Sequence, residues 1–506
     1  MAQLLSPGVY IQEVEAGSRP IEGVGTSVAA FVGLAARGPF NKPTLITNWS
    51  QFTDQFGNFI EGSYLAHAVY GYFLNGGGTC YVVRIGANGS EPAAHAEIPL
   101  GRDRALPYRV TALESGEGGD KISVEVQDAS DQSDETLFKL VVKKGDKEAE
   151  VYDNVTTKRG RRNVVTATKT SKLIQLEEVT GATAIEPVPQ ARAALAGGGA
   201  HAPVRVTPDA YVGNSADRTG FGGLEAIEEV TMLSVPDLMA AYQAGAIDLD
   251  GVQAVQNAMI SHCELMGDRL AILDSPPGLN AQQIKEWRVD KARYDSKFAT
   301  LYWPHLKVFD PLTGQLTFVP PSGHMAGIWA RSDDTRGVHK APANEVIRGA
   351  LDLEVLVTKG EHDQLNPVGI NVIRAFPGRG IRVWGARTLS SDPAWRYVNV
   401  RRLFNFVEES ILGGTQWVVF EPNDMALWER VKRTINSFLV RVWRDGALFG
   451  ATPQEAFYVK CDSETNTAET IDAGQLLVEI GIAPVKPAEF VVFKIAQFSG
   501  GASLTE

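Results

Sequence analysis

The sequence predicts a multi-domain protein of mixed α/β and α+β class, and three observations support this prediction. The chain has 506 residues, more than one hydrophobic core normally holds, so about two to four domains are expected. Apolar runs typical of buried strands alternate with segments of helical spacing on both sides of residues 91–206. Residues 91–206 themselves contain none of the nine tryptophans and repeat short alternating runs typical of β-strands.

These patterns predict the domain boundaries. We expect an N-terminal extended arm (1–25), a discontinuous α/β core domain (26–90 and 207–365), an inserted mostly-β domain (91–206), a C-terminal domain (366–488), and a C-terminal strand arm with a polar tail (489–506). Insertions are tolerated at surface loops, so the inserted domain is expected to project from the surface.

The α/β core is predicted from short elements in order. Strands are expected at 26–34, 43–47, 80–85, 230–235, 269–273 and 299–306, and helices at 50–57, 63–74, 252–266 and 281–288. In the inserted domain, strands are expected at 108–113, 121–127, 137–142 and 163–168, followed by a flexible Ala/Gly tract at 193–200. The C-terminal domain should contain one long helix over about 425–445, because its apolar residues form a single stripe and Gly446 follows it.

Both ends of the chain carry a short apolar strand candidate that has no local partner. One lies at 9–14, between the glycines and prolines of the first 25 residues, and the other at 489–498. Such a strand has too little neighbouring sequence to form its own sheet, so it should pair with an existing sheet edge, in the same molecule or in another. From pattern alone, an edge strand within the same molecule is the default interpretation of 9–14.

Composition and charge exclude several classes of protein. The net charge of −12 disfavours non-specific nucleic-acid binding. Cys80, Cys263 and Cys461 are far apart and form no CxxC pair, which argues against a disulfide framework or a structural zinc site and suits a reducing cytosol. The first residues, MAQLLSPGVY, lack the features of a secretory signal, and no run approaches the ~18 apolar residues of a membrane helix.

Motifs of catalysis and of cofactor binding are missing from the sequence. There is no GxxxxGK[ST], HExxH, GxSxG or GxGxxG, and the eight histidines form no HxH or HxxxH pair, so no catalytic, cofactor-binding or metal site is expected. Residues 25–29 (GTSVA) resemble the serine motif of subtilisin-like proteases, but Ser27 precedes every histidine, contrary to the order in that family. We therefore expect Ser27 to lie in a buried strand, and the basic cluster 158–162 to form a solvated loop.

Three stretches near the C-terminus carry a resemblance to a known family. They are 380–405 (GIRVWGARTLSSDPAWRYVNVRRLFN), 416–424 (QWVVFEPND) and 481–490 (GIAPVKPAEF). Further matches are 6–11 (SPGVYI), 18–21 (SRPI), 25–33, 37–39 (RGP), 269–277 (RLAILDSPP), 319–324 (VPPSGH) and 336–344 (RGVHKAPAN). Together they resemble the contractile tail-sheath family, which covers sheaths of phage tails and of phage-tail-like injection particles. The insertion at 91–206 shows no pattern of this family.

The resemblance implies a structural subunit, not an enzyme. Sheath subunits of this kind polymerise helically around an inner tube and contract to drive the tube through a target envelope. The implied partners are further copies of the chain, the inner tube protein, and baseplate and terminal cap proteins, without nucleic-acid contact or membrane insertion. Assembly is expected in the bacterial cytoplasm, and the final location is a phage tail or an injection particle, released or membrane-attached.

The resemblance also suggests which residues act. Inter-subunit strand exchange is assigned to Val9, Tyr10, Ile11, Val14, Phe490, Val491, Val492, Phe493 and Ile495. Arm hinges are assigned to Gly17, Gly23 and Gly25, because glycine has the widest backbone freedom. Possible tube-facing residues are Arg430, Lys432, Arg433, Arg441 and Arg444. Two alternatives stay open: a non-contracting ring or adaptor protein of the same fold, and a hydrolase with its site on the α/β core or the insertion.

Overall fold

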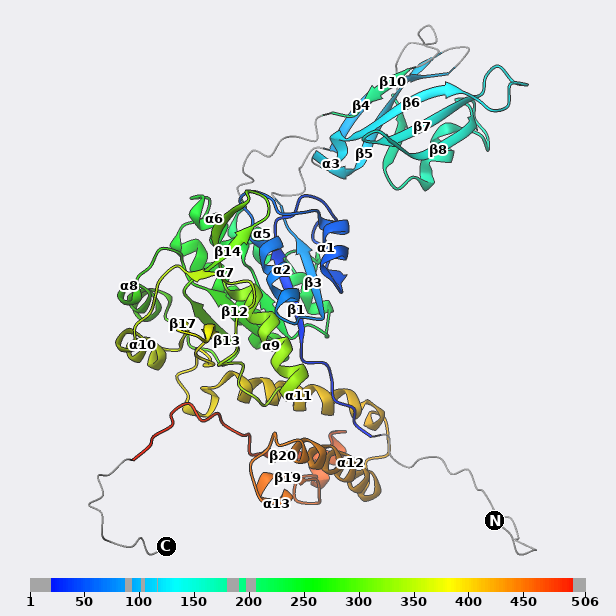
Figure 1. The fold of residues 1–506 in the computed structure, drawn as a ribbon. Helices are drawn as coiled ribbons and strands as arrows, with labels where there is room; N and C mark the ends of the chain where they lie inside the picture. The colour runs from blue at the N-terminus through cyan, green and yellow to red at the C-terminus, as the bar shows by residue number, and fades with distance from the viewer. Residues whose placement is uncertain are drawn as a thin grey trace, which may run out of the picture. The chain divides into compact units, whose positions relative to one another are not determined.

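The computed structural model describes residues 20–86, 93–101, 105–115, 117–179, 191–196 and 206–494. Its mixture of helices and sheets confirms the mixed α/β class (Figure 1). The chain divides into two compact units. The core unit comprises Gly25–Asp334 and Pro342–Arg396, and the C-terminal unit comprises Met1–Val24, Thr335–Ala341 and Tyr397–Glu506.

The core unit is built on an eight-stranded sheet of order β18-β17-β13-β12-β11-β1-β3-β2. Its parallel strands are β1 (Val28–Gly33), β3 (Thr79–Arg84), β11 (Met232–Ser234), β12 (Leu270–Asp274), β13 (Ala299–Trp303) and β17 (Ile370–Phe376). The antiparallel edge strands are β2 (Thr44–Ile46) and β18 (Gly380–Val383). Every residue of β12 and β13 is buried, as continuous apolar runs in a parallel sheet predict.

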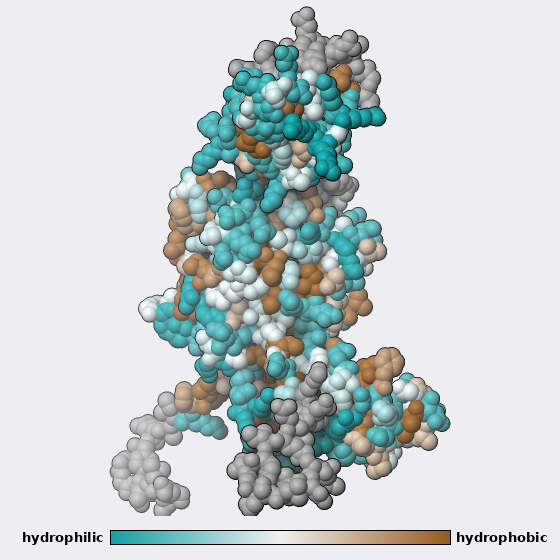
Figure 2. All heavy atoms as spheres, turned by 90° about the vertical axis from the view of Figure 1, so that its right-hand side faces the viewer, coloured by the Kyte–Doolittle hydropathy of each residue, from teal (hydrophilic) through white to brown (hydrophobic). Residues whose placement is uncertain are grey.

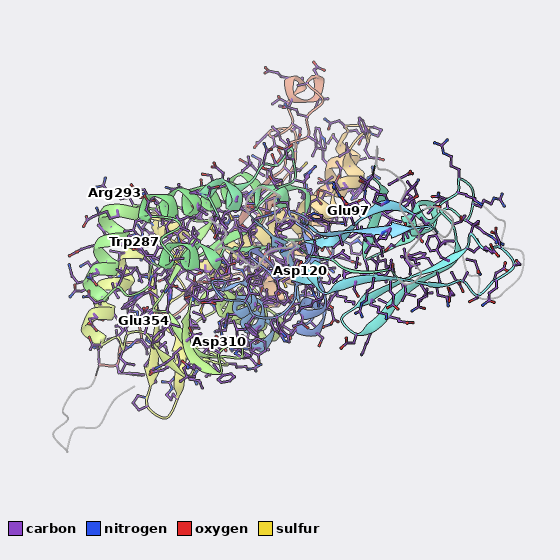
Figure 3. All side chains as sticks on the ribbon, turned by 90° about the horizontal axis from the view of Figure 1, so that it is seen from above. Glu97, Asp120, Trp287, Arg293, Asp310 and Glu354 are labelled. Atoms are coloured by element: carbon purple, nitrogen blue, oxygen red, sulfur yellow. The ribbon has the colours of Figure 1, made fainter. Side chains whose placement is uncertain are left out.

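Helices complete the core unit. They are α1 (Trp49–Phe56), α2 (Leu65–Leu74), α5 (Pro208–Val212), α6 (Asp237–Gln243), α7 (Leu249–Met266), α8 (Ala281–Glu286), α9 (Ser322–Arg336) and α10 (Lys359–Leu365). Local sequence sets their ends: the Asp248 side chain accepts a hydrogen bond from the Gly251 amide at the start of α7, and Gly267 ends that helix in a left-handed conformation. A π-helical turn, Trp287–Ala292, continues α8 as far as Arg293 (Figure 3).

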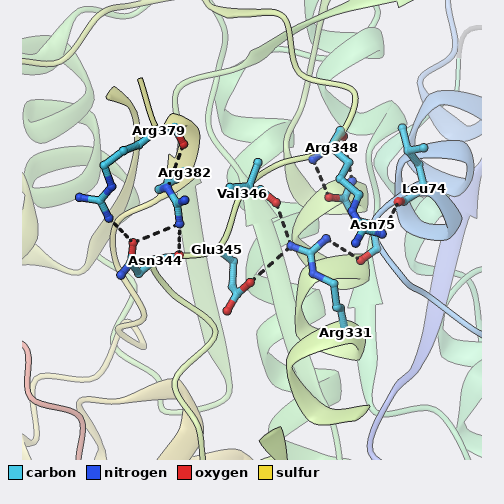
Figure 4. A network of polar contacts seen from close by, with 9 residues as sticks. All are labelled: Leu74, Asn75, Arg331, Asn344, Glu345, Val346, Arg348, Arg379 and Arg382. Carbon is cyan, nitrogen blue, oxygen red and sulfur yellow. Dashed lines mark hydrogen bonds and ion pairs between the residues drawn. The ribbon is translucent and has the colours of Figure 1, made fainter. Parts of the chain in front are cut away.

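A polar network fastens residues 344–348 to the helices of the core unit (Figure 4). The buried Asn75 side chain, just after α2, donates to the Arg348 carbonyl at 3.1 Å and accepts from the Arg348 amide at 2.9 Å. Arg331 of α9 donates to the carbonyls of Asn75 at 3.1 Å and Val346 at 2.8 Å. The chain that returns to the core unit after Ala341 is therefore held by side-chain bonds to the backbone.

One expected strand of the core is in fact two. The run 299–306 was predicted to be a single strand, but it contains the whole of β13, then Pro304 and His305, then the first residue of β14 (Leu306–Asp310). Because proline lacks an N–H donor, the sheet pairing is interrupted there. β14 pairs instead with β15 (Gln315–Val319) and β16 (Asp352–Leu353) in a separate small sheet.

The inserted segment folds as two antiparallel sheets that share one hydrophobic core. Their strands are β4 (Ala93–Leu100), β5 (Leu106–Ser115) and β9 (Ile174–Glu178) in one sheet, and β10 (Arg192–Ala194), β6 (Ile122–Asp128), β7 (Phe138–Lys144) and β8 (Lys147–Val155) in the other. Two short helices, α3 (Glu117–Asp120) and α4 (Val164–Ala167), accompany them. The predicted strand at 163–168 was wrong, because the Asn163 side chain caps the first turn of α4. Part of the expected linker at 193–200 is strand β10.

The C-terminal unit combines helices with one small sheet. Its elements are α11 (Val398–Gly414), α12 (Met425–Arg444), α13 (Pro453–Ala456), β19 (Phe457–Lys460), α14 (Ala468–Asp472) and β20 (Glu479–Ile482). The predicted apolar stripe of α12 is confirmed, since its buried residues form a core with residues of α11 and β19. The expected boundary at 366 differs from the compact unit, which resumes at Tyr397 because β17 and β18 pair into the core sheet.

Candidate functional site

The sheet of the C-terminal unit has two strands, and one of its edges is open among the described residues. β19 and β20 pair antiparallel, from Phe457 opposite Ile482 to Lys460 opposite Glu479. Within the part of the chain that the structure describes, no strand pairs with the outer edge of β19, whereas residues 483–485, just after β20, bond backbone to backbone with residues 447–449. An edge strand presents unpaired backbone N–H and C=O groups, which can accept a strand from another chain.

The two faces of this sheet differ. Phe457 is buried, and Val459, Ile480 and Ile482 pack against the same core beneath it. On the opposite face, the ring of Tyr458 lies over Gly481, where an added Cβ would come within 2.2 Å of the tyrosine Cε1. Any side chain at 481 would therefore displace this ring, which explains a glycine in the middle of a strand.

The segment after β20 is anchored as far as Glu489 and then becomes fully exposed. The carboxylate of Glu489 accepts a hydrogen bond of 2.9 Å from the Tyr397 hydroxyl, and the Val485 carbonyl accepts one of 3.1 Å from the Asn399 side chain. The next four residues are the predicted exchange residues Phe490, Val491, Val492 and Phe493, exposed by 73%, 70%, 77% and 83%.

This apolar run has no strand partner among the residues that the structure describes. Residues 489–494, expected to be part of a strand, have no sheet pairing in the described chain. Four consecutive exposed apolar residues are unfavourable in water, at about 1.5–3 kcal/mol for each large side chain left uncovered. Of the other predicted exchange residues, Val9, Tyr10, Ile11, Val14 and Ile495 lie outside the described residues, as does the predicted hinge Gly17.

The N-terminal segment is part of the C-terminal unit. Ile21 is 1% exposed and belongs to the hydrophobic core of this unit. Gly414 of α11 makes room for it, because a Cβ at 414 would lie 2.6 Å from the Ile21 Cγ1. The Val24 amide donates to the Ser410 hydroxyl at 3.1 Å, and the Arg441 guanidinium donates to the Ile21 carbonyl. The end of the expected free arm is thus fixed to α11 and α12.

The two described hinge candidates have different surroundings. A Cβ at Gly23 would lie 2.9 Å from the Phe406 ring, so glycine is required there for close packing. A Cβ at Gly25 would have no neighbour within 4 Å, and Gly25 is the first residue of the core unit. Of these two described glycines, Gly25 has the open surroundings that a hinge requires, and the hinge role stays a prediction.

The basic residues of α12 divide into bonded and unbonded groups. Arg441 is exposed and donates a hydrogen bond to the Ile21 carbonyl of the N-terminal segment, and its tube-facing role stays a prediction. Arg430 pairs with Glu421 at 3.1 Å, and Lys432 pairs with Glu429 one turn earlier. The remaining two, Arg433 and Arg444, are exposed and have no ion pair among the described residues.

The loop between α11 and α12 holds a feature that sequence reasoning missed. Residues Val418 to Glu421 form a turn closed by a 3.1 Å hydrogen bond from the Glu421 amide to the Val418 carbonyl. Val419 has φ −65° and ψ 128°, and Phe420 has φ +68°, which are the angles of a type II turn. Glycine normally occupies the left-handed position, and a bulky residue there costs about 1–2 kcal/mol.

The side chain of Phe420 is completely exposed. The turn is braced on one side by Arg430, whose guanidinium lies over the Trp417 ring at 5.2 Å and bonds Glu421. On the other side the Asn423 side chain donates 2.8 Å to the Gln475 carbonyl. A strained, rigid turn that presents an aromatic ring to solvent carries no signal in a single sequence, because QWVVFEPND reads as an ordinary loop.

Buried carboxylates of the core unit have structural partners. Asp237 accepts hydrogen bonds from the Leu34 amide at 2.5 Å, the Ser63 hydroxyl at 2.9 Å and the Leu65 amide at 2.8 Å, and burial raises its pKa to about 6. Asp274 accepts 2.9 Å and 2.5 Å hydrogen bonds from the amide and hydroxyl of Ser322, and burial raises its pKa to about 7. Both join the ends of strands to helices.

The serine of the protease-like motif has no catalytic partner among the described residues. Ser27 is half-buried just before β1, and no histidine lies within hydrogen-bonding distance of it in the described ranges. Two acidic residues, Asp310 at the end of β14 and Glu354 just after β16, come from separate elements of the core unit (Figure 3). Among the described residues, no three His, Cys, Asp or Glu side chains are placed to hold a metal ion, and none of the described helices is long and apolar enough to cross a membrane.

Comparison with known proteins decides the family. The phage tail sheath protein central domain matches residues 223–389, and the phage tail sheath C-terminal domain matches residues 390–498, together more than half of the chain. This chain belongs to the tail sheath family. The sequence-based recognition is therefore confirmed, and the second match begins close to the end of the core unit at Arg396.

Individual sheath proteins are similar over different lengths. The tail sheath protein of Burkholderia phage BcepMu is 26% identical, over 96% of this chain and 95% of its own. The tail sheath protein of Vibrio phage KVP40 is 24% identical over 56% of this chain, which spans only 45% of that relative. The contracted helical sheath of the anti-feeding prophage has a similar fold, with a TM-score of 0.60 and 25% identity over 97% of this chain and 99% of that one.

Proposed function

We propose that this sheath protein polymerises into a helical array around an inner tube, and that neighbouring subunits are joined by exchange of their end strands. The proposal rests on two complementary features of the C-terminal unit, an open sheet edge and an exposed apolar segment. In the part of the chain that the structure describes, the outer edge of β19 is unpaired, and the apolar run Phe490–Phe493 has no strand partner.

Strand exchange suits a polymer that must change shape. Backbone hydrogen bonds join the chains, and the side chains of Phe490–Phe493 lose their exposure on joining. Such an interface is head-to-tail, because the donor segment and the acceptor edge are different surfaces, and an interface of this kind that does not close on itself generates a helix.

Contraction follows in this proposal from a second, lower-energy packing of the same subunits. The chain crosses between its compact units after Val24, Asp334, Ala341 and Arg396. We propose that the subunits move as rigid bodies while the exchanged strands keep the array linked. Each subunit would then contribute a small gain in free energy. The gains of hundreds of copies would together drive one stroke of the tube.

The proposed partners are the inner tube, a baseplate and a terminal cap. Solved structures with a similar fold include chains from the baseplate and from the contracted helical sheath of the anti-feeding prophage. Within the C-terminal unit, Arg433 and Arg444 are the α12 cations still available for an acidic tube surface. No observation favours a non-contracting ring or a hydrolase.

Electron microscopy of purified chains tests this proposal. The full chain should form hollow striated tubes, alone or when it is co-expressed with its tube protein. Deleting residues 1–20 should leave a folded monomer that builds no long tubes, and so should the double variant Val491→Lys/Val492→Lys. The matched control Leu312→Lys, at an exposed leucine of the core unit, should still build tubes. Normal tubes from both arm variants would refute strand exchange.

A further inference from the structure

One loop of the inserted domain, which joins β8 to α4, concentrates positive charge. Within five consecutive positions it carries four exposed cations, which are Lys158, Arg159, Arg161 and Arg162. We call residues 156–163 the basic loop. The two sheath-family matches, 223–389 and 390–498, do not reach it, so membership of the family assigns it no role.

Hydrogen bonds fix the shape of the basic loop. The Thr156 amide donates to the Arg162 carbonyl at 2.8 Å, and the Val164 amide donates to the Thr156 carbonyl at 3.0 Å. The Asn163 side chain donates to the Thr157 carbonyl at 3.2 Å. The cations therefore project from a preformed backbone, which loses little freedom when a partner binds.

Two of the four cations lie near acidic side chains of the same domain. The Asp131 carboxylate lies 3.9 Å from the Arg162 guanidinium. The pKa of Asp134 is lowered, first by its hydrogen bonds from Thr136 and then by the positive charge of Lys158. The acidic residues therefore partly balance the charge of Lys158 and Arg162.

The other two cations form the tip of the basic loop. Arg159 and Arg161 flank Gly160, and no ion pair holds either of them among the described residues. A Cβ at Gly160 would have no neighbour within 4 Å, so the tip is open to solvent. Guanidinium groups bind phosphate oxygens through paired N–H donors. Two of them, close together and without a partner in the chain, indicate a tip that binds phosphate groups.

The surroundings of the basic loop favour a purely electrostatic contact. The aromatic residues described in the inserted domain are Tyr108 and Phe138, both buried, and the half-buried Tyr152, whose hydroxyl donates to Glu150 at 2.8 Å. The described part of this domain thus has no fully exposed ring on which the bases of a single-stranded nucleic acid could stack. Figure 2 shows hydrophilic side chains, in teal, over most of the face of this domain that it draws.

An anionic bilayer fits this compact cluster better than duplex DNA does. The phosphates of DNA are fixed along a line, and proteins that bind them spread their cations along a stripe or a helix. Anionic lipids diffuse in the plane of the bilayer, so several headgroups can gather beneath one small cluster of Lys and Arg. The net charge of −12 disfavours contact through the remainder of the chain, so the basic loop would set the orientation.

We propose that the basic loop binds the surface of an anionic phospholipid bilayer, with Arg159 and Arg161 on the lipid phosphates. The contact is electrostatic and involves no insertion into the bilayer. It goes beyond the assembly proposed above and does not depend on it. In an array of many copies the loop would be repeated on each copy, so that a weak contact per copy would suffice.

Flotation of lipid vesicles tests the proposal on the purified full chain. Vesicles of phosphatidylglycerol and phosphatidylcholine should carry the chain upward through a density gradient at low salt, and vesicles of phosphatidylcholine alone should not. Assembled tubes sediment, so flotation separates lipid binding from polymerisation. Arg159→Gln/Arg161→Gln should lower the partition coefficient about thirtyfold. The matched control Lys291→Gln/Arg293→Gln, at two exposed cations of the core unit with the same spacing, should leave it unchanged.

The possible results separate the loop from the total charge of the chain and from assembly. Equal flotation with both kinds of vesicle, or equal flotation of the wild-type chain and the loop variant, would overturn the inference. An equal loss in the control variant would do the same, because total charge would then set binding. Tighter binding to a fluorescent duplex DNA than to the anionic vesicles, lost in the loop variant, would overturn it in favour of nucleic acid. Circular dichroism and tube assembly of the loop variant should match the wild type, so strand exchange and lipid binding fail independently.

Discussion

The core sheet and the sheet of the C-terminal unit differ at their edges. The core sheet has eight strands, with its buried parallel strands at the centre and the short β2 and β18 at its edges. The C-terminal sheet has two strands, an outer edge at β19 with no partner in the described chain, and an exposed apolar segment that follows it. The core unit is thus complete as a single chain, whereas the C-terminal unit has the features of a part that is completed by other copies.

Exposed apolar residues alone do not make this distinction. The core unit exposes Phe309 by 56% and Leu316 by 49%, but these residues face each other across paired strands. Among the described residues, neither a partner strand nor a helix covers Phe490–Phe493, which stay exposed. What distinguishes the C-terminal unit is that apolar exposure coincides with unpaired backbone, and the following predictions test this difference.

The largest expected effect comes from removing one buried side chain from each unit. Ile21→Ala and Leu301→Ala each empty a site that is at most 1% exposed, and each should cost about 2–5 kcal/mol. Hydrogen exchange should show faster opening of α11 and α12 in the first variant, and of β12 and β13 in the second. If Ile21→Ala loosened the core sheet equally, the two units would not be energetically separate.

A second prediction concerns the core unit and pH. Burial raises the pKa of Asp274 from 3.8 to about 7, so between these values the folded chain binds more protons than the unfolded chain. Its contribution to stability is therefore complete at low pH and is lost as the pH rises through about 7. Between pH 6.5 and 8.5 the free energy of unfolding should fall by about 1 kcal/mol for this group.

Urea unfolding at several pH values checks this prediction. Asp274→Asn should flatten the fall between pH 6.5 and 8.5, whereas Asp237→Asn should flatten it less, since the pKa of Asp237 is about 6. His324 acts in the opposite direction and at lower pH, because burial lowers its pKa to about 4. An unchanged slope in Asp274→Asn would show that this carboxyl titrates elsewhere.

Arg441→Ala tests whether this arginine stabilises the C-terminal unit or binds the inner tube. Losing its partly exposed hydrogen bond to the Ile21 carbonyl should cost about 0.5–1 kcal/mol and increase exchange of the amides near Val24. The paired control Arg433→Ala/Arg444→Ala should leave stability unchanged and reduce capture of the tube protein. If Arg441→Ala instead left stability unchanged and reduced capture of the tube protein, Arg441 would face the tube.

The smallest expected effect is a gain in stability. Phe420→Gly removes a bulky residue from a left-handed backbone position, and should stabilise the C-terminal unit by about 0.5 kcal/mol after the greater entropy of glycine is subtracted. Phe420→Ala retains the strain and serves as the control. Chemical unfolding measures both; a loss of stability in Phe420→Gly would mean that the exposed ring makes contacts within the unit.

Several elements were accessible from local sequence. Continuous apolar runs predicted β1, β3 and β12, and a single apolar stripe predicted α12. The end strands were recognisable as segments without neighbours, and the stretches 380–405, 416–424 and 481–490 were sufficient for the family. All of these depend on residues close together in the chain, where the periodicity of burial is directly visible.

What the sequence determined by itself was therefore the type of its longer elements, the family and the chain segment at 490–493 that lacks a partner. Only the tertiary structure decided that β17 and β18 belong to the core sheet, that Ile21 fills the core of the C-terminal unit and that Arg441 binds the Ile21 carbonyl. It also decided the left-handed turn at Phe420. The physical reason is that these features arise from contacts between distant residues, as between Ile21 and Arg441, or from strain that neighbouring contacts impose, and neither leaves a periodic pattern in the local sequence.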